Sequence, residues 1–129
     1  MHTREIVISD KAPKAIGPYS AGIRFGPFVF TAGQVGIDRK LGKMVEGGVE
    51  AEARQALTNL KSVLEAAGTS LENVVKTTVF LKDMDDYAAV NAIYAEFFTS
   101  NYPARSAVAV AGLPAGTQVE IEAIASMPE

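Results

Sequence analysis

Residues 49–67 read VEAEARQALTNLKSVLEAA, and this stretch decides the fold class. Its apolar residues recur every three or four positions and so form one stripe along a helix. They are Val49, Ala53, Ala56, Leu57, Leu60, Val63, Leu64 and Ala67. Gly68 supplies the helix stop, because glycine readily takes the left-handed conformation that ends a helix. Glu50 and Glu52 fall in the opening turn, where we expect both on the solvated surface and Glu50 near Arg54.

Short β-prone segments flank this helix on both sides. Before it we expect strands at residues 5–8, 21–25 and 28–32, and after it at 74–81, 107–111 and 119–125. Gly26 and Pro27 separate the second and third of these strands, which predicts a hairpin. Residues 36–48 carry glycines among charges and predict a solvated excursion ahead of the helix.

A second helix is predicted after the strand at 74–81. Its candidate caps are Asp83, Asp85 and Asp86. Its stripe, which we interpret as core rather than as an aromatic stacking platform, consists of Tyr87, Val90, Ile93, Tyr94, Phe97 and Phe98. Asn91 on this otherwise apolar face is interpreted as a structural hydrogen-bonding residue. The element order is therefore βββαβαββ, which predicts an α+β fold with both helices on one face of a mixed sheet.

Length and composition restrict the class of protein. The chain has 129 residues, 48% hydrophobic and 21% charged, which predicts a single domain over residues 1–129. The formal net charge of −3 provides no large positive field, so we expect no nucleic-acid partner. No apolar run approaches the ~20 residues of a bilayer span and no export signal is recognisable. We therefore expect no membrane partner and a cytoplasmic location.

Few residues could carry chemistry by themselves. Because there is no cysteine and His2 is the only histidine, a thiol nucleophile, a Ser-His-Asp triad and a zinc site are excluded. The Gly-Lys pair at 42–43 does not make a phosphate loop, since Met44 occupies the place of the metal-binding serine or threonine. The acidic residues within 83–86 lack the pattern of a calcium loop. We predict no metal site.

The last predicted strand has two different faces. Glu120, Glu122 and Ile124 share one of them, because side chains alternate along a strand. The other face carries Val119, Ile121, Ala123 and Ala125. A sheet face that mixes carboxylates with apolar residues is not satisfied by water alone. We therefore infer that another subunit covers part of it.

The residues just before the strand at 107–111 read YPARS, at 102–106, and Glu120 lies at the beginning of the following strand. If these two strands pair as a hairpin, Arg105 and Glu120 approach one another. Their spacing alone favours an ordinary surface ion pair, worth less than about 1 kcal/mol.

A resemblance to a known family changes that interpretation. The matching motifs are Pro13 with AIGPYS at 15–20, TAGQ at 31–34, EARQALTNL at 52–60, VKTTVFL at 75–81, VNAIY at 90–94, FF at 97–98, PARS at 103–106, LP at 113–114 and VEIEAIA at 119–125. They cover nearly the whole chain, in order and at sensible spacing. The sequence thereby resembles the Rid family of reactive-intermediate deaminases, the YjgF-like proteins.

The resemblance implies a chorismate-mutase-like two-layer fold and a homotrimer whose sheets pack around a central barrel, with ligand clefts between neighbouring subunits. It also implies hydrolysis, without a cofactor, of 2-imino acids or their enamine tautomers to 2-keto acids and ammonia. Typical substrates in the family are 2-aminoacrylate, 2-iminopropionate and 2-iminobutanoate, which are released by pyridoxal-phosphate enzymes acting on serine or threonine.

The resemblance further implies roles for five residues. Arg105 would grip the substrate carboxylate with two parallel hydrogen bonds, and Glu120 matches the position that orients or activates water and shuttles a proton to the departing nitrogen. Burial would raise the pKa of Glu120 whereas a nearby Arg105 would lower it. Main-chain groups of Gly33 and Ala107 match cleft-lining positions, and Tyr19 matches a ligand-facing hydroxyl. The residues alone equally allow Gly33 as a turn residue and Tyr19 as a partly buried aromatic.

The chain departs from common family patterns at several positions. Ala32 and Ala107 stand where serine and cysteine are frequent, and AG at 21–22 replaces glutamine and alanine. A thiol contribution is therefore impossible, although main-chain contacts at Ala107 survive. One alternative is a regulatory protein that binds small metabolites in the same cleft without turnover. Another is the translation inhibition or ribonuclease action attached to some members, which the low pI and the lack of a basic aromatic strip disfavour.

Overall fold

A six-stranded mixed sheet lies at the centre of the computed structural model, which describes residues 3–129, so that His2 lies outside the described residues. Its strands are β1 (Glu5–Val7), β2 (Gly22–Phe25), β3 (Phe28–Thr31), β6 (Val74–Leu81), β7 (Ala104–Ala109) and β8 (Val119–Ser126). Their spatial order is β1-β2-β3-β8-β6-β7. The pair β6–β7 is parallel, and the other neighbours are antiparallel. The predicted mixed sheet is confirmed.

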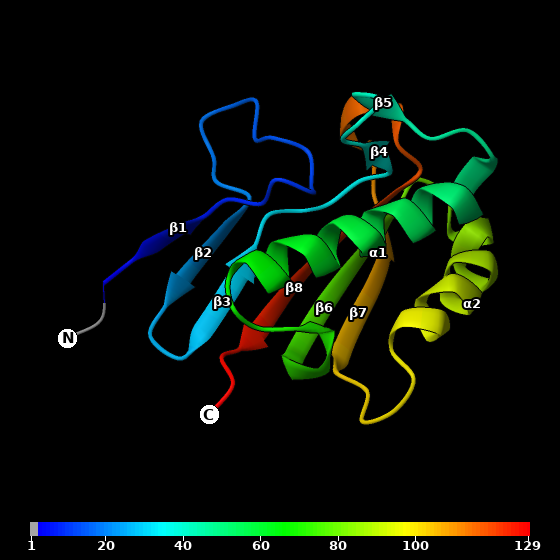
Figure 1. Ribbon diagram of the computed structural model, residues 1–129. Coiled ribbons are helices and arrows are strands. Elements are labelled where there is room, and N and C mark those ends of the chain that lie inside the picture. The colour runs from blue at the N-terminus through cyan, green and yellow to red at the C-terminus, as the bar shows by residue number, and fades with distance from the viewer. Residues whose placement is uncertain (1–2) are drawn as a thin grey trace.

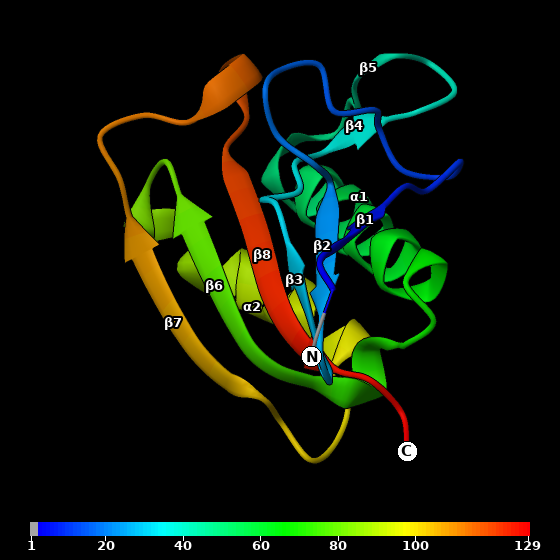
Figure 2. The same ribbon diagram turned by 90° about the vertical axis from the view of Figure 1, so that its left-hand side faces the viewer.

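Two helices cover one face of this sheet, α1 (Gly48–Ala66) and α2 (Tyr87–Phe97). Figures 1 and 2 show both helices on the same side, with the opposite side of the sheet open. Short 3₁₀ turns complete the chain: η1 (Leu71–Asn73), η2 (Met84–Asp86) and η3 (Pro114–Gly116). Apart from a small hairpin described below, the order of strands and helices is βββαβαββ, as predicted. None of the helices within residues 3–129 has the length and apolarity to cross a membrane.

The apolar stripe of α1 forms the main core against the sheet. Leu57, Leu60 and Leu64 are fully buried together with Val29 of β3 and Ile121 of β8. Each fully buried aliphatic side chain of this kind contributes about 1.5–3 kcal/mol relative to an exposed one. The packing of α1, the helix predicted from the apolar periodicity, therefore helps to hold β8 in the middle of the sheet.

Gly68 ends α1 as expected. Its φ of 92° is left-handed, and its N–H donates to Glu65 O at 3.0 Å. The next N–H, of Thr69, reaches back to Leu64 O at 3.0 Å. These bonds satisfy carbonyls at the end of the helix.

Two boundaries differ from the predicted ones. The excursion at 36–48 contains a short antiparallel hairpin, β4 (Ile37–Asp38) with β5 (Lys43–Met44). Asn59 Nδ2 of α1 stabilises this segment by donating to the carbonyls of Val35 and Ile37, both at 2.9 Å. The strand expected at 107–111 begins at Ala104 instead, since β7 pairs in parallel with β6 from Lys76 onward.

Glu52 is buried, not solvated as expected, and its side chain ties α1 to the start of β8. Its exposed fraction is 5%. The carboxylate accepts hydrogen bonds from Thr117 Oγ1 at 3.0 Å, from the Gln118 main-chain N–H at 2.8 Å and from Gln118 Nε2 at 2.8 Å. Arg54 pairs across the helices with Glu96 at 2.9 Å, instead of with Glu50.

Removing the Glu52 side chain is expected to destabilise the fold. Glu52→Ala leaves the main-chain N–H and Nε2 of Gln118 without their acceptor, whereas Thr117 Oγ1 still donates to Val119 O at 2.9 Å, so the free energy of unfolding should fall by about 2–4 kcal/mol. Urea unfolding at fixed protein concentration measures this loss. Glu50→Ala, in the exposed first turn of the same helix, is the matched control and should change the stability by no more than about 0.5 kcal/mol. Equal losses in both variants would contradict a specific role for Glu52.

Candidate active site

Arg105 lies on β7 with its side chain on the helix-covered face of the sheet. It pairs in parallel register with Thr77 of β6, which is fully buried under α2. Nη1 of Arg105 donates to Asn91 Oδ1 at 2.7 Å, and Nη2 donates to the Tyr87 hydroxyl at 2.7 Å. Two groups on α2 thus hold the guanidinium, and the hydrogen-bonding role expected for Asn91 is confirmed.

Two aromatic rings of α2 also contact the guanidinium. Arg105 Cζ lies 4.7 Å from the centroid of the Tyr94 ring and 5.6 Å from that of Tyr87. The Tyr94 hydroxyl is hydrogen-bonded to Thr77 Oγ1 at 2.7 Å. Burial raises the pKa of Tyr94, opposed in part by the Thr77 bond and by the charge of Arg105, so the ring stays neutral at physiological pH. Tyr87, expected in the buried stripe, is instead 38% exposed.

The main chain of Ala107 faces the open edge of the sheet. β7 is an edge strand, and the Val110 N–H donates to Leu81 O of β6 at 2.9 Å. In a parallel pair, successive residues direct their main-chain groups alternately to the neighbour and away from it. The N–H groups of Arg105, Ala107 and Ala109 therefore point outward. Ala107, two residues after Arg105 on β7, therefore presents an unpaired main-chain N–H at this edge of the sheet.

Glu120 lies on the opposite, open face of the sheet, close to Gly33. It pairs in register with Phe80 of β6. Phe30 pairs with Ile124, and Gln34 pairs with Ile121. The chain after β3 therefore has one more residue between these two pairs than β8 has, and this extra residue makes a β-bulge. A Cβ atom on Gly33 would lie 2.5 Å from Glu120 Cδ. Only glycine allows this approach of the main chain to the carboxylate.

The pKa of Glu120 is raised above its ordinary value. Burial of the carboxyl group is the main cause, and the negative charge of Glu122 on the same strand face adds to it. The sequence suggested two opposing effects on the pKa of Glu120, burial and a nearby Arg105, and only burial acts within one chain. Arg105, on the other face, does not offset it.

Gly33→Ala is expected to displace the Glu120 carboxylate without unfolding the chain. The new Cβ would overlap the flexible end of the Glu120 side chain, which can rotate away from it. If Glu120 takes part in catalysis, the turnover number should fall about 10–100-fold. Steady-state kinetics and thermal unfolding test this. Gly112→Ala is the control, because a Cβ there meets no atom within 4 Å; an active Gly33→Ala protein would remove Gly33 from the site.

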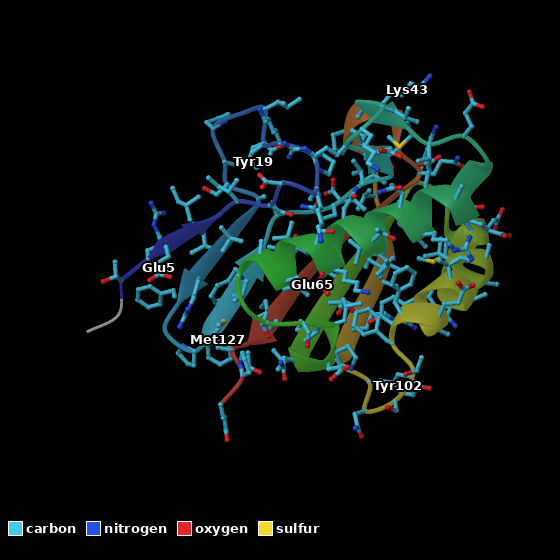
Figure 3. The ribbon with its side chains drawn as sticks, viewed as in Figure 1. Glu5, Tyr19, Lys43, Glu65, Tyr102 and Met127 are labelled. Atoms are coloured by element: carbon cyan, nitrogen blue, oxygen red, sulfur yellow. The ribbon has the colours of Figure 1, made fainter. Side chains whose placement is uncertain are left out.

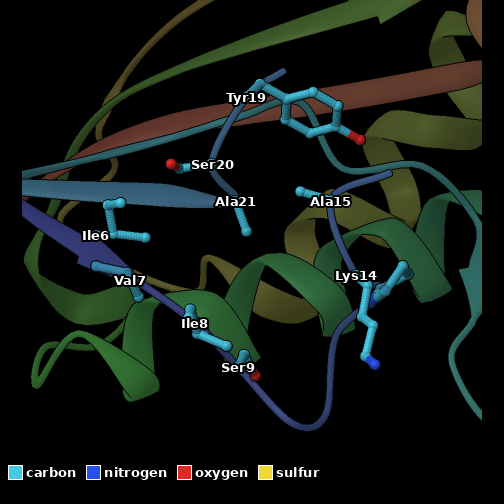
Figure 4. Close-up of a pocket in the computed structure, with 10 residues that line it drawn as sticks. Ile6, Val7, Ile8, Ser9, Lys14, Ala15, Tyr19, Ser20 and Ala21 are labelled. Carbon is cyan, nitrogen blue, oxygen red and sulfur yellow. The ribbon is translucent and has the colours of Figure 1, made fainter. Parts of the chain in front are cut away.

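Tyr19 stands on the loop between β1 and β2 and is 54% exposed. Figure 3 shows it on this loop, which lies beyond one end of the strands β1 and β2. Its ring borders a cavity of about 330 Å³ between β1 and the loop, which is drawn in Figure 4 with Ile8 and Lys14 on its walls. Tyr19 also lines a second, smaller cavity together with Gly33. Tyr19, Gly33 and Glu120 thus form one group.

Arg105 and Glu120 do not approach one another within one chain, so the expected hairpin and ion pair are wrong. β6 lies between their strands, and the loop that joins β7 to β8 crosses it. Arg105 is level with Thr77 and Glu120 with Phe80, a shift of three residues. Two strand spacings and three residues place their Cα atoms about 14 Å apart, with side chains on opposite faces. The site residues predicted from the sequence therefore fall into two separate groups.

Within residues 3–129, no group of three or more histidine, aspartate or glutamate side chains is placed to hold a metal ion. The chemistry available to the described residues is anion binding at Arg105 and Ala107, and proton transfer at Glu120.

Comparisons with known proteins identify the family of this chain. A family model described as Endoribonuclease L-PSP, of the YjgF/Rid family, matches residues 9–127. The chain belongs to this family. A RutC family protein of Pyrococcus horikoshii is 52% identical over 95% of this chain and 97% of its own. The human protein named 2-iminobutanoate/2-iminopropanoate deaminase is 49% identical over 95% of this chain and 89% of its own.

Solved structures of the YjgF/Rid family agree in fold. The YjgF gene product of E. coli superimposes with a TM-score of 0.92, at 46% identity, over 96% of this chain and 99% of that one. E. coli TdcF, solved with bound serine, gives a TM-score of 0.91 at 41% identity, over 96% and 99% of the two chains. The α+β fold with two helices on a mixed sheet is confirmed.

Proposed function

We propose that this chain hydrolyses reactive 2-imino acids, or their enamine tautomers, to 2-keto acids and ammonia without a cofactor. The substrate class would be 2-aminoacrylate, 2-iminopropionate and 2-iminobutanoate. The observation that carries the proposal is the Arg105 guanidinium, held by neutral groups beside the outward N–H of Ala107. Relatives about half identical over most of the chain are named for this reaction. The serine in TdcF, an amino acid with its carboxylate next to a nitrogen-bearing carbon, supports the same ligand class.

The active site would form between two copies of the chain. Arg105 and Ala107 lie at the β7 edge, whereas Tyr19, Gly33 and Glu120 lie on or above the open face. A substrate of three or four carbon atoms is much shorter than the distance between these groups. One copy would therefore present its β7 edge to the Gly33–Glu120 face of the next.

Such a contact joins two different surfaces and therefore gives a closed ring or an open filament, not a two-fold dimer. We propose a homotrimer, the smallest such ring. The apolar residues exposed on the open sheet face, Phe28, Phe30 and Val108, support this assembly. Light scattering coupled to size exclusion tests it: a mass three times the 13.6 kDa of the chain is expected, and a monomer that turns over imines would refute the split site.

In the proposed reaction, Arg105 binds the substrate carboxylate through two hydrogen bonds and the Ala107 N–H adds a third. The C=N carbon, which is electrophilic once the nitrogen is protonated, then lies near Glu120 of the neighbouring copy. Glu120 accepts a proton from water as the oxygen bonds to that carbon, which gives a carbinolamine. It then returns this proton to the nitrogen, and as the C–N bond breaks and ammonia leaves, the Glu120 carboxylate takes up the hydroxyl proton so that the C=O bond forms. One water is consumed, and one keto acid and one ammonia leave. Positioning supplies much of the rate, because the reacting groups are held together.

The decisive experiment is an imine-hydrolysis assay. An amino-acid oxidase with catalase generates 2-iminopropionate or 2-iminobutanoate in solution, and trapping of the remaining imine reports its lifetime. We expect the protein to shorten that lifetime and to accelerate the release of ammonia and keto acid. Ligand binding without acceleration would favour the regulatory, metabolite-binding alternative. Cleavage of RNA by rigorously purified protein that survives in the Arg105→Ala variant would favour the activity in the family description.

We propose a cytoplasmic location. Because the chain contains no cysteine, its fold does not depend on disulfides and is compatible with a reducing compartment.

A further inference from the structure

The Arg105 guanidinium is held from one side only. Its two hydrogen-bond partners, Tyr87 and Asn91, stand four residues apart and therefore on the same face of α2. They use two of the five N–H groups of arginine. The remaining three have no hydrogen-bond partner among the described residues, and a cavity of about 400 Å³ lies beside the guanidinium, lined also by Asn91 and Tyr94.

Both partners are neutral. Tyr87 and Asn91 accept hydrogen bonds without carrying a charge, and no carboxylate forms an ion pair with Arg105 among the described residues. A carboxylate in either place would neutralise the guanidinium and weaken its attraction for an acidic substrate. The hydroxyl of Tyr87 therefore fixes the direction of the guanidinium while leaving its positive charge available.

The position of Tyr87 suits this function. It is the first residue of α2, follows directly on η2 and is 38% exposed, so its ring lies partly outside the core, where its hydroxyl reaches Arg105 of β7. The Tyr94 ring supports the same guanidinium at 4.7 Å and is buried. Tyr94 holds the inner side of the guanidinium, and Tyr87 holds its outer end.

We propose that Tyr87 is a positioning residue for substrate binding, acting through Arg105. Its hydroxyl holds Nη2 so that the free N–H groups of the guanidinium present a fixed pair of donors to the carboxylate of a 2-imino acid. This inference rests on the proposed function. Because a carboxylate is bound alike in the ground state and the transition state, loss of the hydroxyl should raise KM more than it lowers kcat.

Tyr87→Phe tests the proposal, because it keeps the ring and removes only the hydroxyl. We expect KM for 2-iminopropionate to rise about 5–20-fold, with kcat changed by no more than about threefold. The dissociation constant of 2-oxobutanoate, a product of the proposed reaction, should rise by the same factor as KM in calorimetry. The melting temperature should stay within a few degrees of wild type.

Thr58→Val is the matched control, because it also removes only a hydroxyl. Thr58 is exposed on α1, and its hydroxyl donates to Arg54 O at 2.8 Å, away from Arg105. Its variant should keep the wild-type KM. A wild-type KM in Tyr87→Phe, or an equal rise in both variants, would overturn the proposal.

A double-mutant cycle separates positioning from a merely structural role. In an Arg105→Lys background the planar guanidinium is gone, so Tyr87→Phe should add less than about twofold to the dissociation constant of 2-oxobutanoate. Fully additive losses would mean that Tyr87 acts independently of Arg105. Absence of both turnover and 2-oxobutanoate binding in the wild-type protein would instead refute the proposed function, which keeps the two failures distinguishable.

Discussion

Replacing Arg105 by alanine is expected to lower kcat/KM for 2-imino acids by about 10²–10⁴-fold while leaving the chain folded. Two hydrogen bonds from a guanidinium to a carboxylate contribute about 3–6 kcal/mol in total, and every 1.4 kcal/mol corresponds to tenfold in rate. The fold should survive, because the partners that Arg105 leaves behind, Asn91 and the exposed Tyr87, are neutral and accessible to water.

Steady-state kinetics with freshly generated 2-iminopropionate, together with thermal unfolding and light scattering, check this expectation. Arg54→Ala is the matched control, because it removes the same positive charge. Arg54 lies on α1, and its exposed ion pair with Glu96 of α2 does not involve Arg105. Arg105→Lys should recover part of the binding, since a lysine keeps the charge but not the planar pair of donors. Unfolding of Arg105→Ala would assign Arg105 a structural role, and wild-type rates in a folded variant would exclude it from the site.

Local elements of the fold could be predicted from the sequence because each has a local cause. The stripe of α1 follows from the 3.6-residue period, and its end follows from the left-handed conformation of Gly68. The two faces of β8 follow from strict alternation: Ile121 is buried under α1, and Glu120 lies on the open face. Such patterns need no knowledge of distant residues.

The pairing of strands could not be predicted in the same way. β7 and β8 are consecutive in the sequence, which favours pairing, yet β6 lies between them. The reason is that β7 follows α2 and returns in parallel beside β6, while β8 inserts on the other side of β6 under α1. Arg105 and Glu120 were expected to meet for this reason, and the sheet order separates them.

Buried or bound polar groups were equally hard to foresee. Glu52 has the sequence context of a solvated helix residue, and its partners Thr117 and Gln118 are far away in the chain. Tyr87 fits the apolar period of α2, but its place at the first turn leaves the ring half outside the core. Tyr87 was expected only as a core residue, and the polar atom at the end of its ring is the one feature that could have indicated a hydrogen-bonding role.

Replacing Glu120 by glutamine is expected to lower kcat about a hundredfold or more while changing the affinity for 2-oxobutanoate little. Glutamine keeps the size of the side chain beside Gly33 but cannot accept a proton, and general acid–base catalysis contributes about 10²–10⁴ in rate. Kinetics and calorimetry on the same protein separate the two effects. Glu72→Gln, on η1, is the control for loss of one negative charge. An unchanged kcat would remove Glu120 from the mechanism.

The dependence of activity on pH provides a second test of the role of Glu120. Glu120 must be ionised to accept the proton of water, so activity should fall as the pH drops through its pKa. Within the chain, burial and the charge of Glu122 raise that pKa, whereas Arg105 of the neighbouring copy would lower it in the proposed assembly. Glu122→Gln removes one of the two causes and should move the acidic limb of kcat/KM to lower pH, with little change in the plateau. A limb that stays in place in Glu122→Gln, or that persists unchanged in Glu120→Gln, would mean that another group titrates.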